Sequence, residues 1–345
     1  MKRGRVVALA GAAAGLAAGV VAERVAVKRR RARDPEGEED FGSRRGERSR
    51  KLELDDGARI YIEEIGPEAS SGVVFIHGSA LRTDLWHYQM RGFEKRRLIF
   101  YDMRGHGMSH PKGSAEYSVA TLAGDLEAVI DDCKLEEVVI VGHSIGGMAA
   151  LELASSRPEV LGSKVKGLVL VNTTYRPPIE TVAGGAALAH LDRMVKKPME
   201  LLSPFSSRID RLRKIVKPSD ALFWTVAFAG FGPGASAKQV DFTYDMLADT
   251  PSDVIFDLLK AYRGFDVRDR LGEVTVPVLV VAGRQDRITL PEASEHLGAH
   301  LPKARLEIFD DCGHMTMLEK HEEFNSLLES FLLDTVGPSR RRRKK

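Results

Sequence analysis

Cysteine is scarce in this sequence: the 345 residues include only two, Cys133 and Cys312. Two cysteines form at most one disulfide bridge, and their spacing matches no zinc-binding pattern. A scaffold built on several disulfides and a cysteine-based zinc site are therefore excluded. The sequence also contains no internal repeat. Its length suits one large α/β domain with insertions, or two smaller domains.

A strong overall charge is lacking as well, but the net charge of +2 is unevenly distributed. Residues 1–50 carry thirteen Lys and Arg against seven Asp and Glu, a net charge of +6. The six basic residues at 340–345 add another +6, and subtracting both from +2 leaves −10 for residues 51–339. An acidic body without a basic stripe argues against nucleic acid as the main partner.

Long apolar runs are absent apart from Val6–Ala22, seventeen residues without a charge between two basic clusters. This is short for a bilayer span, and Gly11, Gly15 and Gly19 give one helical face a smooth stripe. We expect residues 1–33 to form a membrane anchor, with the body on the cytoplasmic side because basic charge follows the run. The alternatives are a cleaved signal peptide of a secreted protein, or an Ala-rich helix without a membrane role.

Two polar segments flank the predicted body. Residues 34–50 are polar and charged, and we expect them to be a linker. Residues 337–345 form a basic tail, which is either a second contact with anionic lipid or a solvated end.

The body has the pattern of an α/β fold with a mainly parallel, doubly wound sheet. A β-hairpin is predicted over residues 51–62, because two alternating segments flank Asp56-Gly57. A helix is predicted at about 119–133. Short apolar runs predict buried strands at 73–76, 98–101, 138–141, 168–171, 278–282 and 306–309. Strands that alternate with helices indicate a parallel sheet covered on both faces.

Residues 173–271 separate two parts of this core, 51–172 and 272–336. A segment of this length is too long to be a loop and contains helical patterns, for example at 221–228 and 254–262. We therefore expect a helical cap over the carboxyl ends of the strands.

The predicted cap has two features that bear on substrate binding. Its apolar stretch contains Phe223, Trp224 and Phe228, which we expect to line an acyl pocket; the alternative is ordinary packing of the cap on the core. Between residues 190 and 217 there are eight Lys and Arg against three acids. This basic group is either a solvated helix face or an edge that faces lipid.

Gly142-His143-Ser144-Ile145-Gly146 directly follows an apolar strand. A G-x-S-x-G sequence at this position is typical of a tight strand-to-helix turn that exposes the serine hydroxyl. Both glycines are expected to be needed because a side chain there would collide with the neighbouring strand and helix. Ser144 is therefore the candidate nucleophile.

A serine nucleophile needs a base, and the base needs an acid that orients it. His314 lies five residues after the last predicted strand, and Asp286 follows the strand before it. We expect His314 to be the base and Asp286 the acid. Asp310 and Asp311 are alternative acids but lie very near His314 in sequence, whereas His143 is expected to pack locally.

An oxyanion hole requires two backbone N–H groups that point toward developing negative charge. Ile145 follows the nucleophile at the start of the next helix, so its N–H is one candidate donor. The second candidate is the N–H of Ser79, in the loop His77-Gly78-Ser79-Ala80 after an apolar strand. Gly78 permits the sharp turn that this loop needs.

The order of these motifs resembles the α/β-hydrolase superfamily over residues 51–335. The turn Asp102–Ser109, with the sequence DMRGHGMS, is similar to the branch that includes serine esterases, monoacylglycerol-lipase-like enzymes and cofactor-free haloperoxidases. In that branch the turn is mainly structural, which implies structural roles for Asp102, Arg104 and His106. The resemblance implies an α/β-hydrolase fold with a helical cap insertion.

The same resemblance implies a triad of Ser144, Asp286 and His314, with oxyanion donors at Ser79 and Ile145. A serine in this turn excludes the aspartate-dependent dehalogenases and epoxide hydrolases of the superfamily. We expect a serine hydrolase that cleaves apolar or lipid-like carboxylic esters through an acyl-enzyme, without a metal or organic cofactor. The alternatives are a cofactor-free haloperoxidase or perhydrolase, a carbon–carbon bond hydrolase, and a ligand-binding module without catalysis.

Overall fold

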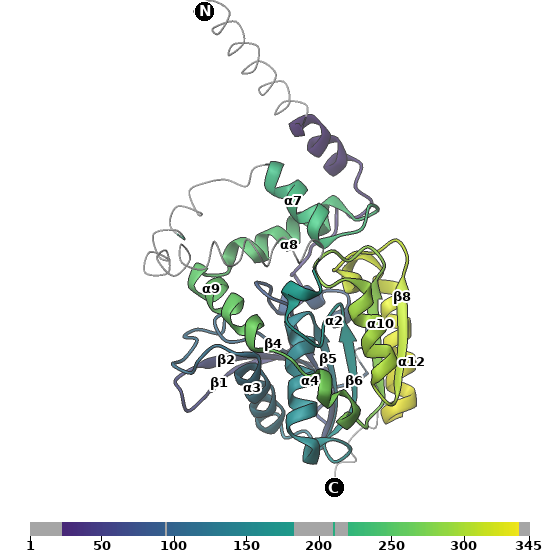
Figure 1. The fold of residues 1–345 in the computed structure, drawn as a ribbon. Coiled ribbons are helices and arrows are strands. Elements are labelled where there is room, and N and C mark those ends of the chain that lie inside the picture. The colour runs from purple at the N-terminus through teal and green to yellow at the C-terminus, as the bar shows by residue number, and fades with distance from the viewer. Residues whose placement is uncertain (1–22, 94, 183–209, 211–219, 338–345) are drawn as a thin grey trace, which may run out of the picture.

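The computed structural model describes residues 23–93, 95–182, 210 and 220–337, and its centre is an eight-stranded sheet (Figure 1). The strand order is β1-β2-β4-β3-β5-β6-β7-β8. The strands are β1 (Arg48–Glu53), β2 (Arg59–Ile65), β3 (Ser71–Ile76), β4 (Leu98–Tyr101), β5 (Glu137–His143), β6 (Val165–Val171), β7 (Val278–Gly283) and β8 (Ala304–Phe309). All six predicted buried strands are therefore present.

The sheet is antiparallel at one edge and parallel elsewhere. The predicted hairpin is formed by β1 and β2, with Leu52 opposite Ile60, and β2 also pairs antiparallel with β4. Gly57 turns the hairpin with φ +84°, a conformation that suits glycine. From β4 to β8 every neighbouring pair is parallel, which requires a crossover between strands.

Helices cover both faces of the sheet, as the doubly wound prediction requires (Figure 1). One hydrophobic core joins the sheet to α3 (Val119–Asp132), α4 (Ile145–Ser156) and α10 (Pro291–His300). The other core joins it to α2 (Gln89–Gly92) and α12 (His321–Val336). The inner parallel strands β3, β4, β5, β6 and β7 are buried on both sides, which explains why their sequences are continuous apolar runs rather than alternating ones.

The described part of the predicted cap lies at the carboxyl ends of the parallel strands (Figure 1). It comprises α7 (Asp220–Gly230), α8 (Ala237–Asp249) and α9 (Ser252–Ala261). Helix α8 begins at a serine cap, because the Ser236 side chain accepts hydrogen bonds from the N–H groups of Lys238 and Gln239. The basic group between residues 190 and 217 lies outside the described residues.

The segment expected to be a linker, residues 34–50, is instead held against the body. The Asp34 carboxylate accepts hydrogen bonds from the Ser236 hydroxyl and the Lys238 N–H, and Phe41 stacks on Phe242 at 4.8 Å. The first strand begins at Arg48, three residues before the expected start of the core. Side chains in this polar segment make long-range contacts that local composition does not reveal.

The apolar run Val6–Ala22 lies outside the described residues, and so do residues 338–345 of the basic tail. The helix that follows the apolar run is described over residues 23–32. Within the described ranges, no helix is both long enough and apolar enough to cross a bilayer.

Candidate active site

Ser144 lies between β5 and α4, at the carboxyl edge of the sheet. Its backbone has φ 53° and ψ −120°, a left-handed conformation that is strained for a residue with a side chain. The N–H of Ser144 donates to the carbonyl of Val171 at the end of β6, and its own carbonyl accepts from Met148 in α4. The turn is therefore held by the neighbouring strand and by the helix that it starts.

The two glycines of the turn lie where a side chain does not fit. A Cβ at Gly142 would lie 2.5 Å from the carbonyl oxygen of Gly146, and one at Gly146 would lie 2.6 Å from that of Ile76. Both contacts are with backbone, so no side-chain rotation relieves them. The G-x-S-x-G pattern thus reflects close packing of α4 on β3 and β5.

His314 and Asp286 come together after the two last strands of the sheet. The Nδ1 atom of His314 lies 2.7 Å from Oδ2 of Asp286, and both side chains are buried. The alternative acid Asp311 is exposed. Nε2 of His143 is hydrogen-bonded to the His314 carbonyl at 3.0 Å, which brings the histidine loop against the residue before Ser144. The structure contains no hydrogen bond between Ser144 Oγ and the His314 ring, an interaction that often tightens only with bound substrate.

Asp286 is surrounded by hydrogen-bond donors. The N–H groups of Ile288 and Thr289 donate to Oδ1 at 2.8 and 2.9 Å, and the Thr289 hydroxyl donates to Oδ2. The Asn172 amide also donates to Oδ2 at 2.9 Å. Burial by itself would raise the pKa of Asp286, but His314 and these donors outweigh it and lower the pKa. The carboxylate therefore remains charged.

Asn172 and Thr289 were not among the residues expected from the sequence. Asn172 directly follows β6 and also donates to the carbonyl of Gly313, beside the histidine. Its backbone has φ 46°, which asparagine tolerates better than most residues. A polar residue at the end of a buried strand was the available signal, whereas Thr289 offered only its proximity to Asp286.

Two other histidines near the serine turn, His77 and His106, have structural partners. His77 Nε2 accepts the N–H of Met103, and His106 Nε2 accepts the N–H of Ala80. Asp102 accepts two backbone N–H groups, while Arg104 forms ion pairs with Asp125 and Asp56. These contacts agree with the structural roles that the resemblance implied for the Asp102–Ser109 turn.

The loop that contains Ser79 packs directly on the serine turn. A Cβ at Gly78 would lie 2.6 Å from Nδ1 of His143 and 3.2 Å from Cβ of Ser144. The hydroxyl of Ser79 is hydrogen-bonded to that of the partly buried Tyr262, at the end of the cap. Ile145 begins α4, where the first N–H groups have no partner within the helix. Tyr262 is a further residue that the sequence did not indicate.

A mainly apolar cavity of about 210 Å³ opens beside Ser144. Ser144 lines it together with Met148, Pro177, Pro178, Ile179, Val182, Leu259, Tyr262, Arg263, Ile288 and Thr289. The expected pocket residues Phe223, Trp224 and Phe228 do not line it, and that expectation is corrected. Phe223 instead packs into the core beneath α7, while Trp224 and Phe228 are exposed on the other side of that helix.

The cap is bonded to the histidine loop through the end of α7. The carbonyl of Gly230 accepts the N–H of His314, and the partly buried carboxylate of Glu319 accepts the N–H groups of Gly232 and Gly313. Helix α11 (Thr316–Glu319) thus links the cap and the loop. The end of α7 is therefore bonded directly to the backbone of His314.

A family model described as the alpha/beta hydrolase fold matches residues 73–321. A protein of Variovorax paradoxus assigned as the carbamate hydrolase RutD is 27% identical over 282 residues, covering 81% of this chain and 98% of its own. The 2-hydroxy-6-oxononadienedioate/2-hydroxy-6-oxononatrienedioate hydrolase of Cupriavidus pinatubonensis is also 27% identical, covering 79% of this chain and 90% of its own.

Among solved structures, an esterase from Exiguobacterium antarcticum has a TM-score of 0.64 and 25% identity. The similarity covers 83% of this chain and 99% of the esterase. The family model spans well over half of the sequence, and it includes the serine turn, the Asp286–His314 pair and the Ser79 loop. This chain belongs to the α/β-hydrolase family.

Proposed function

We propose that this protein is a serine hydrolase that cleaves carboxylic esters with an apolar acyl part. Three observations together carry the proposal. Asp286 and His314 form a hydrogen-bonded pair, Ser144 has a strained backbone, and Ser144 lines an apolar cavity. The esterase likeness among solved structures supports the same reaction class.

In the proposed mechanism, Ser144 Oγ attacks the ester carbonyl while His314 Nε2 accepts its proton. Asp286 holds the other ring nitrogen and stabilises the positive imidazolium. The N–H groups of Ser79 and Ile145 donate to the tetrahedral oxyanion. His314 then protonates the leaving alkoxide, and an attacking water releases the acid from the acyl-enzyme by the same steps.

Replacement of Ser144 by alanine tests the nucleophile. We expect Ser144→Ala to abolish both ester hydrolysis and labelling by a fluorophosphonate probe, because the variant lacks the hydroxyl that forms the acyl-enzyme. Ser156→Ala is the matched control, since Ser156 is an exposed serine on the same helix. Labelling that persists in Ser144→Ala and disappears in another serine variant would show that the nucleophile is a different residue.

The reaction type is tested with p-nitrophenyl esters of graded chain length. The cavity is small and apolar, so we expect turnover with a maximum at short to medium acyl chains. Halide-dependent peroxide chemistry without ester turnover would favour the haloperoxidase alternative. Cleavage of a carbon–carbon bond in a vinylogous diketone would favour the other enzymatic alternative, the carbon–carbon bond hydrolase. Tight binding without turnover would indicate a ligand-binding module.

We further propose that the apolar run Val6–Ala22 attaches the protein to a membrane, with the body on the cytoplasmic side. The basic residues that follow the run support this orientation. Flotation of the full chain with vesicles, before and after alkaline extraction, tests the attachment. If the protein produced in cells is recovered in the soluble fraction and has lost residues 1–22 by cleavage, a secreted protein would be favoured.

A further inference from the structure

Exposed apolar side chains gather at one end of the molecule. Of the seven large hydrophobic side chains that are exposed in the described residues, four lie on the helix of residues 23–32 and on α7. They are Val25, Leu222, Trp224 and Phe228. Phe228 is 67% exposed, which is unusual for a phenylalanine in a folded protein.

Specific contacts hold the helix of residues 23–32 against α7 and α8. Arg31 forms a two-bond ion pair with Asp241 of α8, at 2.7 Å for each bond. Arg30 donates to the Ala235 carbonyl, and its guanidinium lies 5.6 Å from the centre of the Trp224 ring. Val27 is fully buried beneath the helix. The helix of residues 23–32 is therefore a fixed part of this face.

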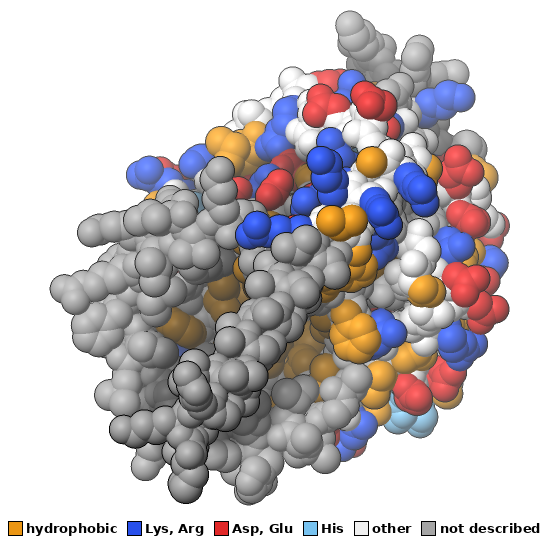
Figure 2. Space-filling view, turned by 90° about the horizontal axis from the view of Figure 1, so that it is seen from above, with side chains coloured by type: hydrophobic (Ala, Val, Ile, Leu, Met, Phe, Trp, Pro, Cys, Tyr) orange, Lys and Arg blue, Asp and Glu red, His pale blue; other side chains and the backbone are white. Residues whose placement is uncertain are grey.

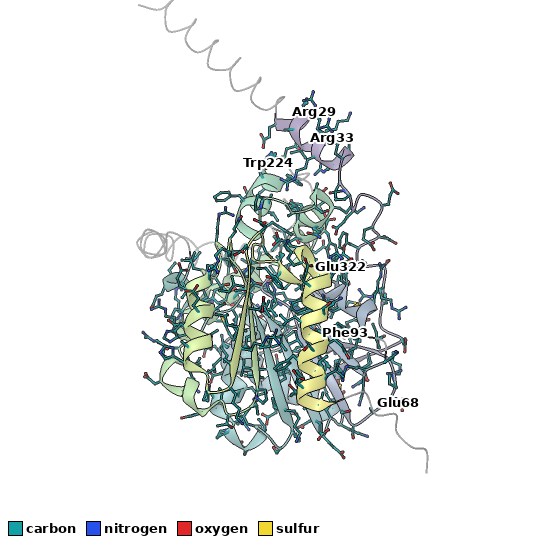
Figure 3. The ribbon with its side chains drawn as sticks, turned by 90° about the vertical axis from the view of Figure 1, so that its right-hand side faces the viewer. Arg29, Arg33, Glu68, Phe93, Trp224 and Glu322 are labelled. Atoms are coloured by element: carbon teal, nitrogen blue, oxygen red, sulfur yellow. The ribbon has the colours of Figure 1, made fainter. Side chains whose placement is uncertain are left out.

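Basic residues surround the apolar side chains. Lys28, Arg29 and Arg33 are exposed and form no ion pair with any residue in the described ranges. Arg29 and Arg33 project from the same end of the molecule as Trp224 (Figure 3). Viewed from above, Lys and Arg side chains adjoin hydrophobic ones on this face, while many acidic side chains lie toward its rim (Figure 2).

The segment that precedes this face in the sequence indicates the kind of partner that the face contacts. The uncharged run Val6–Ala22 connects directly to residue 23, at this end of the molecule (Figure 1). Exposed Trp and Phe side chains beside unpaired Lys and Arg are typical of surfaces that lie at the boundary of an anionic bilayer. A bilayer as the partner explains why the exposed basic residues directly follow the apolar run, whereas a protein partner does not explain this order.

We propose that helix 23–32 and the outer side of α7 together form a face that docks on an anionic lipid bilayer. This inference rests on the membrane attachment proposed above and adds a second contact, made by the cap itself. Trp224 and Phe228 enter the headgroup boundary, and Lys28, Arg29 and Arg33 contact lipid phosphates. The carbonyl of Gly230, at the end of α7, accepts the N–H of His314, so docking holds the candidate active site near the lipid surface.

Tryptophan fluorescence of the full chain tests the docking face. The chain has two tryptophans, and Trp86 is fully buried while Trp224 is exposed. With vesicles that contain phosphatidylglycerol and brominated phosphatidylcholine, we expect Trp224 emission to shift to the blue and to be quenched. Trp224→Phe isolates Trp86, whose emission should not change. A chain that floats with the vesicles but shows no quenching overturns the docking face and leaves the anchor intact.

Matched substitutions separate docking from anchoring and from catalysis. We expect Phe228→Ser to weaken docking, measured by quenching, about tenfold, because one phenyl ring no longer enters lipid. Leu333→Ser, at an exposed position near the carboxyl end of α12, should leave quenching unchanged. Equal quenching in both variants overturns the proposal. A blue shift of Trp224 emission that appears without vesicles, when the chain associates with a second copy of itself, also overturns it. Hydrolysis of a soluble p-nitrophenyl ester, measured in parallel, reports on the proposed function independently of docking.

Discussion

The charge on Asp286 depends on its neighbours rather than on the residue itself. A buried carboxylate without donors takes up a proton, yet here two backbone N–H groups and the side chains of Asn172 and Thr289 surround it. These donors also fix the direction in which the carboxylate points. At the scale of single residues, the candidate base is therefore oriented by a chain of hydrogen bonds that starts at the end of β6.

Asp286→Asn is expected to lower kcat by about four orders of magnitude, by analogy with other serine triads. The amide cannot stabilise the imidazolium and favours the wrong ring tautomer. Asp311→Asn is the control, since Asp311 is exposed although it lies only three residues before His314 in the sequence. The prediction is checked by steady-state kinetics with a p-nitrophenyl ester. A larger loss in Asp311→Asn would identify that residue as the acid.

Tyr262→Phe is expected to lower kcat about tenfold with little change in KM, the effect of losing one hydrogen bond of about 1 to 1.5 kcal/mol. The Tyr262 hydroxyl is bonded to Ser79, whose N–H is a proposed oxyanion donor. Ser79→Ala removes the same bond and keeps the N–H. The double variant should therefore be no slower than either single variant, and additive losses would contradict a shared role.

At the scale of elements, close approach between β3, β5 and α4 decides how the serine turn is held. Gly142 and Gly146 have backbone atoms within 3 Å of the place that a Cβ would occupy. Gly124, on the exposed side of α3, has nothing within 4 Å of that place. The same residue type thus serves different purposes in two neighbouring helices.

Gly146→Ala is expected to destabilise the protein by about 1–3 kcal/mol, because the added methyl group meets the backbone carbonyl of Ile76. Gly124→Ala should instead stabilise it by up to about 1 kcal/mol, since alanine favours a helix. Urea denaturation of both variants measures the difference. Equal changes in the two midpoints would show that α4 does not pack on β3 as closely as the structure indicates.

At the scale of the whole molecule, burial keeps several of the described histidines in neutral form, among them His77, His106 and His143. Burial lowers the pKa of His77 and His143 well below the ordinary value near 6.5, and lowers that of His106 to about 4. The unfolded chain therefore binds more protons than the folded one between these values and about pH 6.5. Burial of Asp102 has the opposite effect, since it raises the pKa of this carboxyl to about 6.

We expect the free energy of unfolding to change little between about pH 7 and pH 8 and to fall as the pH drops through 6.5 toward 4. Each buried histidine contributes a loss of about 1 kcal/mol per pH unit, and Asp102 offsets part of it below pH 6. Urea denaturation at pH 8, 6.5 and 5 measures this loss. His300→Gln, at an exposed position, should leave the slope unchanged. Stability that rises from pH 7 to pH 5 would contradict the prediction.

Most of the fold followed from local patterns in the sequence. Buried strands are continuous apolar runs, so all six were found, and chain order placed the end of β5 before those of β7 and β8. Ser144, Asp286 and His314 were predicted as the triad because each lies within five residues of the end of a strand. Asn172 was missed because one amide after a strand has no distinctive pattern, and Tyr262 because its partner is distant in the chain.

The sequence by itself determined the α/β-hydrolase family, the strand ends and the residues proposed for the triad, because these depend on short patterns and on the order of strands. Only the tertiary structure decided which residues line the cavity and which side of α7 is exposed. An aromatic residue in an apolar helix satisfies the same pattern whether it faces a pocket, the core or solvent. Phe223 is buried and Phe228 is exposed on one helix, and packing of α7 against α8 and the helix of residues 23–32 assigned each its role.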